Sequence, residues 1–503
     1  DATIMAVGAN EHDNKKGTVR VYKMDYGSWT QLGSDVDGKE VNDSQGFSVS
    51  LSGDGLTLAV GATGHDSNKG TVRTYNYNGT TWSQIGSDLD GTDINDYQGS
   101  SVSLSKDGTT LAVGAYGHDS NKGTVRLYQY DSNTWIQLGT DLDGDSISDY
   151  HGRSVSLSGD GLTLAVGATG FNNNTGAARV YKYDSSTWTQ LGEDIIGSIA
   201  EDYHGNSISI SSSGTTLAVG AWGHDSYKGT ARVYRYASSA WSQIGEDLDG
   251  EAADDYQGWS VSLSSNGLTL AVGAYGHDSN KGTVRIYNIE AEKSGSANRG
   301  TVTLNSQSSN WTQIGNDIDG SGSSSDSSGE RWSSTLDGEA GDKQGYSVSI
   351  SSDGITLAVG ALGHDNNKGT IRAYSLVNDA PEAIAQSVTV DEQTAIDVTL
   401  SATDSDPNTS FVYKIITLPI DGELSENGII INSENLPKTI STNKLSYISN
   451  SDIATSDSFT FKVSDGSVDS ESATVSLAIT AVNDVPVATA QTDVAATEQT
   501  AVT

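Results

Sequence analysis

The sequence predicts an all-β protein, a seven-bladed β-propeller followed by an immunoglobulin-like β-sandwich. Of the 503 residues, 57 are glycine and 22 are tyrosine, while only 18% are charged, a composition that favours short strands and tight turns over helices. One motif returns seven times in the first part of the chain, which is typical of a repeat fold. The nine tryptophans end at Trp332 and the five prolines begin at Pro381, so two unlike parts meet near residue 378.

The charge balance argues against two classes of partner. Lysine and arginine total 28 against 65 aspartates and glutamates, a formal charge of −37, so contacts with the phosphates of a nucleic acid would be unfavourable. No apolar run approaches about 18 residues, and we therefore expect no insertion into a membrane. The chain has no cysteine, and an acidic, cysteine-free composition hints at an extracellular protein.

The repeated motif sets the period of the first part. Its Ala-Val-Gly-Ala sequence recurs every 53 residues, except that the last copy follows after 87 because of an insertion of 34 residues within residues 288–345. The glycine of the motif falls at Gly8, Gly61, Gly114, Gly167, Gly220, Gly273 and Gly360.

Each unit is expected to form four antiparallel strands. In the second unit, residues 47–52 alternate apolar and polar side chains, a Gly-Asp-Gly turn follows, and residues 56–62, 71–77 and 82–85 are three further strands. Repeated sheets of this kind predict a propeller, since a lone four-stranded sheet cannot bury both faces. The first and fourth strands occur only six times. We therefore expect residues 1–377 to form seven blades, blade one lacking its first strand and blade seven its fourth, within a longer parent protein.

The motifs of the unit resemble a known family. Gly46-Phe47-Ser48-Val49-Ser50, Leu58-Ala59-Val60-Gly61-Ala62 and Gly70-Thr71-Val72-Arg73 are similar to the FG-GAP repeat of integrin α-subunit propellers and their bacterial relatives. The resemblance implies the propeller fold but no particular activity, because propellers support many functions. Calcium-binding members have an Asp-rich turn between the first two strands, whereas this turn is only Ser-Gly-Asp-Gly here, so we do not expect calcium at that turn.

The second part begins with a motif that returns once. Asn378-Asp379-Ala380-Pro381 recurs as Asn483-Asp484-Val485-Pro486, and the strand-like runs between the two copies predict an Ig-like sandwich over residues 378–482. Val463-Ser464-Asp465-Gly466 and the Asp-Ser-Asp loop at residues 404–406 resemble cadherin-like tandem repeats of large bacterial surface adhesins. Residues 483–503 would then be the start of a second, truncated repeat.

The cadherin-like resemblance implies calcium at the two ends of the sandwich. Carboxylates crowded at one pole repel one another, and hard oxygen ligands suit Ca²⁺ better than Zn²⁺. The alternative is that these acids only keep loops solvated. The matching positions are Asn378, Asp379, Asp404, Asp406 and Asp465 toward the propeller, and Glu392, Asn483 and Asp484 toward the next repeat.

Three sets of polar residues recur through the propeller. A His-Asp loop follows the second strand in six units, an Asp-x-Asp-Gly-x-x-x-x-Asp loop follows the fourth strand, and an arginine lies on the third strand of every unit. A catalytic site needs one asymmetric set of residues, so we interpret the histidine loops as structural. The acidic loops could bind calcium or be solvated turns. We expect each arginine to pair with a loop carboxylate.

Positions that break the symmetry are the better candidates for a ligand site. Trp222 follows the Ala-Val-Gly-Ala motif of the fifth unit, and Trp259 opens the first strand of the sixth unit. Tyr227 and Tyr275 come from the same sector. Because the loops after the second and fourth strands share one face of a propeller, we expect these four residues to meet there and to hold a glycan by stacking. The alternative is ordinary packing between blades.

The favoured function is a non-enzymatic binding and structural module of a large extracellular bacterial adhesin. Its propeller face would recognise a cell-surface glycan or protein. One alternative is a subunit of an extracellular filament or surface layer, in which further copies complete the incomplete blades. A second alternative is a propeller enzyme acting on carbohydrates, which would need convergent carboxylates or a His/Tyr pair unique to one sector, and none stands out in the sequence.

Overall fold

The computed structural model divides into two compact units, residues 1–377 and residues 378–503, and each is considered by itself. It describes residues 4–25, 28–289, 311–313, 332–333, 341–364, 368–376, 380–404, 411–450, 454–465 and 468–483.

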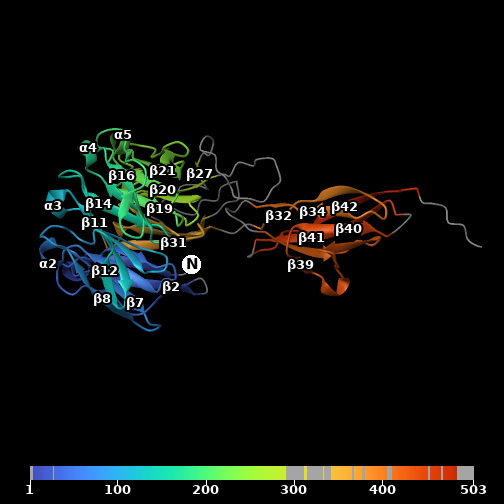
Figure 1. The fold of residues 1–503 in the computed structure, drawn as a ribbon, viewed down its shortest axis with the longest axis horizontal. Helices are drawn as coiled ribbons and strands as arrows, with labels where there is room; N and C mark the ends of the chain where they lie inside the picture. The colour runs from blue at the N-terminus through green and yellow to red at the C-terminus, as the bar shows by residue number, and fades with distance from the viewer. Residues whose placement is uncertain are drawn as a thin grey trace, which may run out of the picture. The chain divides into compact units, whose positions relative to one another are not determined.

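The described residues of the first unit form seven antiparallel sheets, the blades of a β-propeller (Figure 1). Blade two shows the common pattern, in which β5 (Gln45–Leu51), β6 (Thr57–Ala62), β7 (Thr71–Tyr77) and β8 (Trp82–Asp90) pair in sequence order. The all-β class predicted for the chain is confirmed, and the four strands of this unit fall where the period predicts them.

The same strands recur in the other blades. First strands are β9 (Ser101–Leu104), β14 (His151–Leu157), β19 (Ser207–Ile210), β24 (Ser260–Leu263) and β29 (Gln344–Ile350). Second strands are β1 (Ile4–Ala9), β10 (Thr110–Ala115), β15 (Thr163–Ala168), β20 (Thr216–Ala221), β25 (Thr269–Ala274) and β30 (Thr356–Ala361). Third strands are β2 (Thr18–Asp25), β11 (Thr124–Asp131), β16 (Ala177–Tyr183), β21 (Thr230–Ala237), β26 (Thr283–Ile289) and β31 (Thr370–Leu376).

The outer strands are shorter. They are β3 (Ser28–Gln31), β12 (Thr134–Gln137), β17 (Trp188–Gln190), β22 (Ala240–Gln243) and β27 (Trp311–Gln313). Two-residue strands add to the third strands of four blades, namely β4 (Val36–Asp37), β13 (Leu142–Asp143), β18 (Ile195–Ile196) and β23 (Leu248–Asp249). Between second and third strands lie six four-residue turns, α1 (His12–Lys15), α2 (His65–Asn68), α3 (His118–Asn121), α4 (Phe171–Asn174), α5 (His224–Tyr227) and α6 (His277–Asn280).

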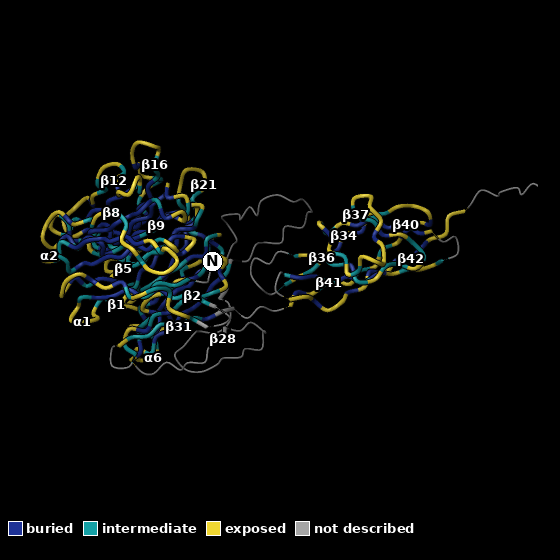
Figure 2. The backbone as a smooth tube through the Cα atoms, turned by 90° about the horizontal axis from the view of Figure 1, so that it is seen from below, coloured by how far each residue is buried: buried dark blue, intermediate teal, exposed yellow. Residues whose placement is uncertain are grey.

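The core lies between neighbouring blades, as the dark inner strands of Figure 2 show. Ala59 and Val72 of blade two pack against Val102 and Leu111 of blade three, and this cluster repeats around the ring. The glycine of the Ala-Val-Gly-Ala motif is required by close backbone contact. A Cβ on Gly61 would lie 1.9 Å from the carbonyl oxygen of Gly99 in the next blade.

In blades two to five, the repeated tryptophans on the outer strands form hydrogen bonds to the preceding blade. The indole Nε1 of Trp82 donates to the carbonyl of Leu32 at 2.8 Å, and that of Trp135 donates to Thr74 Oγ1 at 2.7 Å, in each case one blade back. These side chains therefore pack at the blade edges.

The insertion completes blade seven, which corrects one expectation. We expected this blade to lack an outer strand, but β28 (Trp332–Ser333) pairs antiparallel with β31, so the sheet order is β28-β31-β30-β29. The strand comes from residues before the blade instead of after it, because backbone pairing depends on spatial position and not on chain order. In blade one, β1 pairs only with β2, so this blade lacks a first strand among the described residues.

The second unit is an Ig-like sandwich. One sheet has the order β33-β42-β41-β36-β39 and the other β34-β40-β37-β38. Phe459, Phe461 and Tyr447 are fully buried between them. The strands are β32 (Glu382–Ala383), β33 (Gln386–Asp391), β34 (Ile396–Thr399), β35 (Ala402–Thr403), β36 (Val412–Thr417), β37 (Gly422–Glu426), β38 (Ile429–Ile430), β39 (Lys438–Ile440), β40 (Lys444–Ser449), β41 (Ser456–Ser464) and β42 (Ala473–Thr480), with a 3₁₀ turn at Ser433–Asn435.

Candidate functional site

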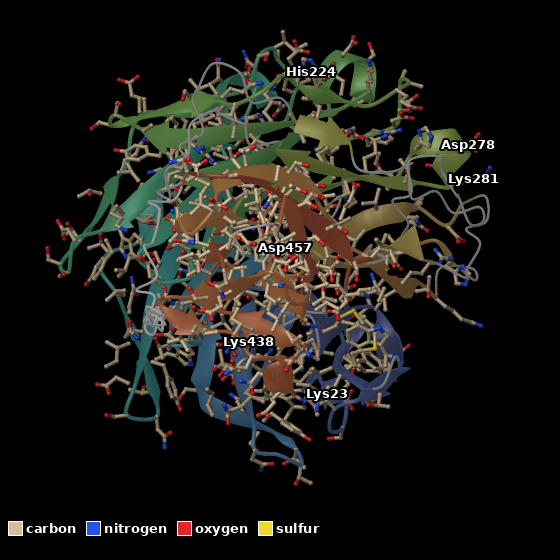
Figure 3. All side chains as sticks on the ribbon, turned by 90° about the vertical axis from the view of Figure 1, so that its right-hand side faces the viewer. Lys23, His224, Asp278, Lys281, Lys438 and Asp457 are labelled. Atoms are coloured by element: carbon tan, nitrogen blue, oxygen red, sulfur yellow. The ribbon has the colours of Figure 1, made fainter. Side chains whose placement is uncertain are left out.

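Five of the His-Asp loops are paired through their histidine with a buried aspartate of the preceding acidic loop. Turn α2 places Nδ1 of His65 2.9 Å from Oδ1 of the buried Asp43, the last acid of the preceding acidic loop. The other oxygen of Asp43 accepts the backbone N–H groups of Lys39 and Glu40. The pair recurs as His118–Asp96, His224–Asp202, His277–Asp255 and His364–Asp342. In Figure 3, His224 and the Asp278–Lys281 ion pair mark successive loops around the ring. Such equal pairs support the structural interpretation.

The arginines on the third strands form hydrogen bonds with carboxylates of the same acidic loops. Arg73 is fully buried, its Nε donating to Asp88 Oδ2 at 2.9 Å and its Nη1 to Gln45 Oε1 at 2.8 Å. Burial raises the pKa of Asp88, but hydrogen bonds from Lys39, Arg73 and Gln84 outweigh it and lower the pKa to about 2. The expected pairing of arginine with a loop carboxylate recurs as Arg20–Asp35, Arg126–Asp141, Arg179–Asp194 and Arg232–Asp247.

Two clusters of three side chains each bring their ligand atoms close enough together to hold one metal ion. They are Asp93, Asp96 and His118, and His224, Asp247 and Asp249. One aspartate of each cluster already has partners, since Asp247 accepts from Arg232 Nε and Gln243 Nε2, each at 2.8 Å, and Asp96 accepts from the backbone of Thr92 and Asp93. A guanidinium beside Asp247 opposes a second cation. We therefore interpret these loops as turns stabilised by arginine.

Blades four and five replace a buried glutamine with histidine. In blade two, Gln45 donates to the carbonyl of Val36 at 2.9 Å and accepts from Arg73. His151 and His204 occupy this position, are fully buried, and have no hydrogen-bond partner at Nδ1. Burial lowers the pKa of both histidines to about 3, so both are neutral at pH 7.

Seven aromatic rings from blades five to seven form one continuous cluster, which we call the aromatic patch. Trp222 stacks on Tyr203 and Tyr227, with ring centroids 4.4 and 5.7 Å apart, and meets Trp259 edge-on at 5.6 Å. Trp259 contacts Tyr275 at 4.8 Å. The four candidate residues thus lie together. The full patch is Tyr203, Trp222, Tyr227, Tyr256, Trp259, Tyr275 and Tyr346.

The patch is partly open to solvent. Tyr227, on turn α5, is 37% exposed and Tyr346 38% exposed, and the other rings are half-buried. The turns α2 to α5 lie on one face of the propeller, the left side of Figure 1, as the shared-face argument requires. Burial raises the pKa of Tyr275 to about 12, so its hydroxyl remains a hydrogen-bond donor. The patch therefore combines ring faces with hydroxyl groups.

Tyr203, Tyr256 and Tyr346 were not among the sequence candidates. Tyr203 and Tyr256 repeat at a spacing of 53 and so belong to the symmetric pattern that the sequence argument set aside. Both have left-handed backbones, with φ of 54° and 58°. That conformation costs an ordinary residue about 1–2 kcal/mol, and bulky side chains are uncommon there. Tyr97 and Tyr150 hold the same position with φ of 54° and 53°, so this conformation belongs to the repeat.

The calcium candidates of the sandwich divide between its two ends. Because β33 runs parallel to β42 and β41 runs antiparallel to both, Asp465 lies at the end where β33 begins, and Asp404 follows β35. Glu392 and Asn483 lie at the opposite end, where Glu392 Oε1 accepts the backbone N–H of Val482 at 2.7 Å. Within the described part of the sandwich, no three acidic or histidine ligands lie together. Asn378, Asp379, Asp406 and Asp484 lie outside the described residues.

Comparisons with known proteins match each part separately. Residues 335–374 match the FG-GAP repeat, and residues 378–478 match the family described as a bacterial Ig domain. No curated protein matches the chain. Both domain types are typical of extracellular proteins and fit a structural or binding module. Among the described residues, no helix is long and apolar enough to cross a membrane.

Several solved structures are similar at low identity. A candidate 6-phosphogluconolactonase from Bacteroides uniformis is 12% identical with a TM-score of 0.49, covering 74% of this chain and 92% of that one. The β-propeller domain of the Trilobed protease from Pyrococcus furiosus is 11% identical with a TM-score of 0.39, covering 74% and 90%. A xyloglucanase from Xanthomonas campestris is 11% identical with a TM-score of 0.39, covering 76% and 55%.

Proposed function

We propose that the chain is a non-enzymatic recognition module of a large extracellular bacterial adhesin, and that its aromatic patch binds a cell-surface glycan. The observation that carries the proposal is the patch itself. Seven rings contact one another over three blades, whereas blade two has Thr63 at the position of Trp222 and Tyr275. Sugar rings present apolar C–H faces that stack on indole and phenol rings, while their hydroxyls bond to tyrosine hydroxyls.

The surroundings of the patch favour binding over catalysis. Glycoside hydrolysis requires two carboxyl groups facing each other across the bond to be broken. Glu201 and Asp254, both exposed, lie beside the patch, and the Tyr256 hydroxyl donates to Asp254 Oδ1 at 3.5 Å. A protein ligand is the alternative occupant. A neutral glycan fits better, because the acidic rim would repel acidic proteins.

The test replaces the two tryptophans by residues that other blades use on the same backbone. Trp222→Thr copies Thr63, and Trp259→Ser copies Ser100, so both changes should leave the blades folded. We expect glycan-array binding by the double variant to fall at least about a hundredfold, since stacking platforms are lost. Tyr116→Thr in blade three is the matched control. Unchanged glycan binding by the folded double variant, or equal losses in the control, would refute the placement.

For the sandwich we propose calcium binding at its ends. Asp404 and Asp465 lie at one end and Glu392 and Asn483 at the other, which agrees with the two half-sites that the cadherin-like resemblance implies. Oxygen ligands of this kind suit Ca²⁺. In an adhesin, ions at these junctions would stiffen the stalk that carries the propeller.

A further inference from the structure

A second group of aromatic rings lies on the loop face, in blades three and four, and it includes an arginine. Tyr116 stacks on Tyr97, with ring centroids 5.1 Å apart and planes 8° apart, and its centroid lies 6.2 Å from that of Tyr150. The guanidinium of Arg153 lies over the Tyr116 ring, with Cζ 5.3 Å from the centroid. We call these four residues, all half-buried, the arginine cluster.

The arginine cluster repeats the geometry of the aromatic patch. Each member lies two 53-residue repeats before a member of the patch, and the counterparts in chain order are Tyr203, Trp222, Tyr256 and Trp259. The ring of Trp222 lies 4.4 Å from that of Tyr203, at 7°, 5.9 Å from that of Tyr256 and 5.6 Å from that of Trp259. The same backbone therefore presents both groups, and the largest chemical difference is that Arg153 stands where the patch has Trp259.

The guanidinium of Arg153 is available to a ligand. The third-strand arginines of blades three and four pair with Asp141 and Asp194, whereas Arg153 forms no ion pair with any acid in the described part of the chain. Asp96 and Asp149, the last acids of the two acidic loops beside the cluster, are buried and accept backbone N–H groups of their own loops. In a chain with a formal charge of −37, a cation without a carboxylate partner is a feature that needs a reason.

The tyrosines add hydrogen-bonding groups beside this cation. In the described structure, the hydroxyls of Tyr97, Tyr116 and Tyr150 form no hydrogen bond with other protein groups. Burial raises the pKa of Tyr116, so its hydroxyl keeps its proton and can donate. A guanidinium that lies flat on a ring still has the N–H groups along its edge, and these match the two oxygens of a carboxylate. The cluster thus combines ring surface, hydroxyl groups and one cation.

We propose that the arginine cluster is a second glycan subsite, selective for a sugar that bears a carboxylate, such as a uronic or sialic acid. The carboxylate would accept N–H groups from the edge of the Arg153 guanidinium, which Tyr116 holds in place. The sugar ring would pack against Tyr97 and Tyr150. This inference rests on the proposed function, since it takes the loop face as a glycan-binding face. Neutral sugars would bind the aromatic patch, where Trp259 offers a ring instead of a charge.

The first experiment measures whether the carboxylate is recognised. A glycan array pairs each uronic- or sialic-acid oligosaccharide with its methyl ester, which removes the negative charge and leaves the sugar unchanged. We expect the full chain to bind the matching acids at least about tenfold more tightly than their esters. Arg153→Asn copies Asn206, the residue at this position in blade five, and should lower acid binding to the level of the esters. Absence of any preference for acids, or the same preference in the folded Arg153→Asn variant, would overturn the proposal.

The second experiment separates the two subsites. Arg153→Asn should leave binding of neutral glycans unchanged, and the Trp222→Thr, Trp259→Ser double variant should keep the preference for acids. Tyr116→Thr should weaken only the acidic members of the array. Loss of neutral binding in the double variant without any preference for acids would overturn this inference alone. Loss of the acid preference in Arg153→Asn, with neutral binding intact in the double variant, would support the arginine cluster and refute the placement of the proposed function.

Two further measurements test the ligand class. Arg153→Trp copies Trp259 and should bind the methyl esters at least as tightly as the acids, because a ring replaces the charge. A penta-glutamate peptide carries carboxylates without a sugar ring and should compete with the bound acidic glycan at least about tenfold less effectively than the free glycan does. Equal competition by the peptide would show that the cluster recognises carboxylates of proteins and would overturn the assignment to a sugar.

Discussion

Blades two and six share the same frame, which we define as the buried residues that hold each blade against its neighbours, but they present different side chains on the loop face. Both hold the His–Asp pair and the arginine on the third strand, and both bury the Ala-Val-Gly-Ala strand. They differ where side chains reach the loop face, with Thr63 and Phe47 in blade two against Tyr275 and Trp259 in blade six. Frame residues repeat because every blade must pack on its neighbours in the same way. Residues at the loop face are free of that requirement, so they can differ from blade to blade.

The largest expected effect comes from breaking the frame. Arg73→Met should lower the free energy of unfolding by about 3–5 kcal/mol, because Asp43 and Asp88 would lose their cation in a buried loop. Urea unfolding followed by tryptophan fluorescence measures the loss. Arg20→Met in blade one is the control. Arg20 and Asp35 are about one-third exposed, so we expect a loss below about 1 kcal/mol. Equal losses would mean that burial does not set the strength of these pairs.

The second prediction concerns the two blades with a buried histidine. The unfolded chain takes up a proton below a pKa of about 6.5, whereas folded His151 and His204 do so only near 3. Stability should therefore fall as the pH drops from about 6.5 toward 3, by about 2 kcal/mol per histidine at pH 5. The double variant His151→Gln with His204→Gln should lose this acid sensitivity in thermal unfolding at pH 7 and pH 5.

The reverse substitution, from glutamine to histidine, extends the comparison to a blade with a buried glutamine. Gln98→His in blade three should add acid sensitivity of similar size, because Gln98 is fully buried at the same position. If the double histidine variant keeps the pH dependence of the natural chain, other groups dominate acid unfolding.

A smaller effect is expected at the outer strands. Trp135→Phe removes the hydrogen bond to Thr74 between blades three and two and should cost about 1 kcal/mol. Trp29→Phe in blade one is the control, because Trp29 makes no such bond among the described residues. Urea unfolding of both variants measures the difference, and a similar cost at both positions would point to lost ring packing instead of the hydrogen bond.

The smallest effect is expected from calcium. Millimolar Ca²⁺ should raise the unfolding temperature of the sandwich by about 2–4 °C while leaving the propeller transition in place. Differential scanning calorimetry of the full chain resolves the two units. Asp404→Asn with Asp465→Asn should reduce the shift. An unchanged transition of the natural chain in Ca²⁺ would mean that these acids only keep the loops solvated.

Much of the fold follows from local patterns in the sequence. The 53-residue period locates each second strand, and the change in composition near residue 378 coincides with the division between the two units. The candidate site was partly predictable, since Trp222 and Trp259 differ visibly from their counterparts. Tyr203 and Tyr256 were missed because their left-handed backbones and their contacts with Trp222 are not visible in the sequence.

The sequence by itself determined the number and order of the strands in most blades, because alternation, turns and spacing act within a single repeat. Only the tertiary structure decided which segments meet across repeats. Trp332 and Ser333 pair with a strand more than 40 residues further along the chain, which no local pattern indicates. The aromatic patch arises in the same way, because it depends on how one blade packs against the next.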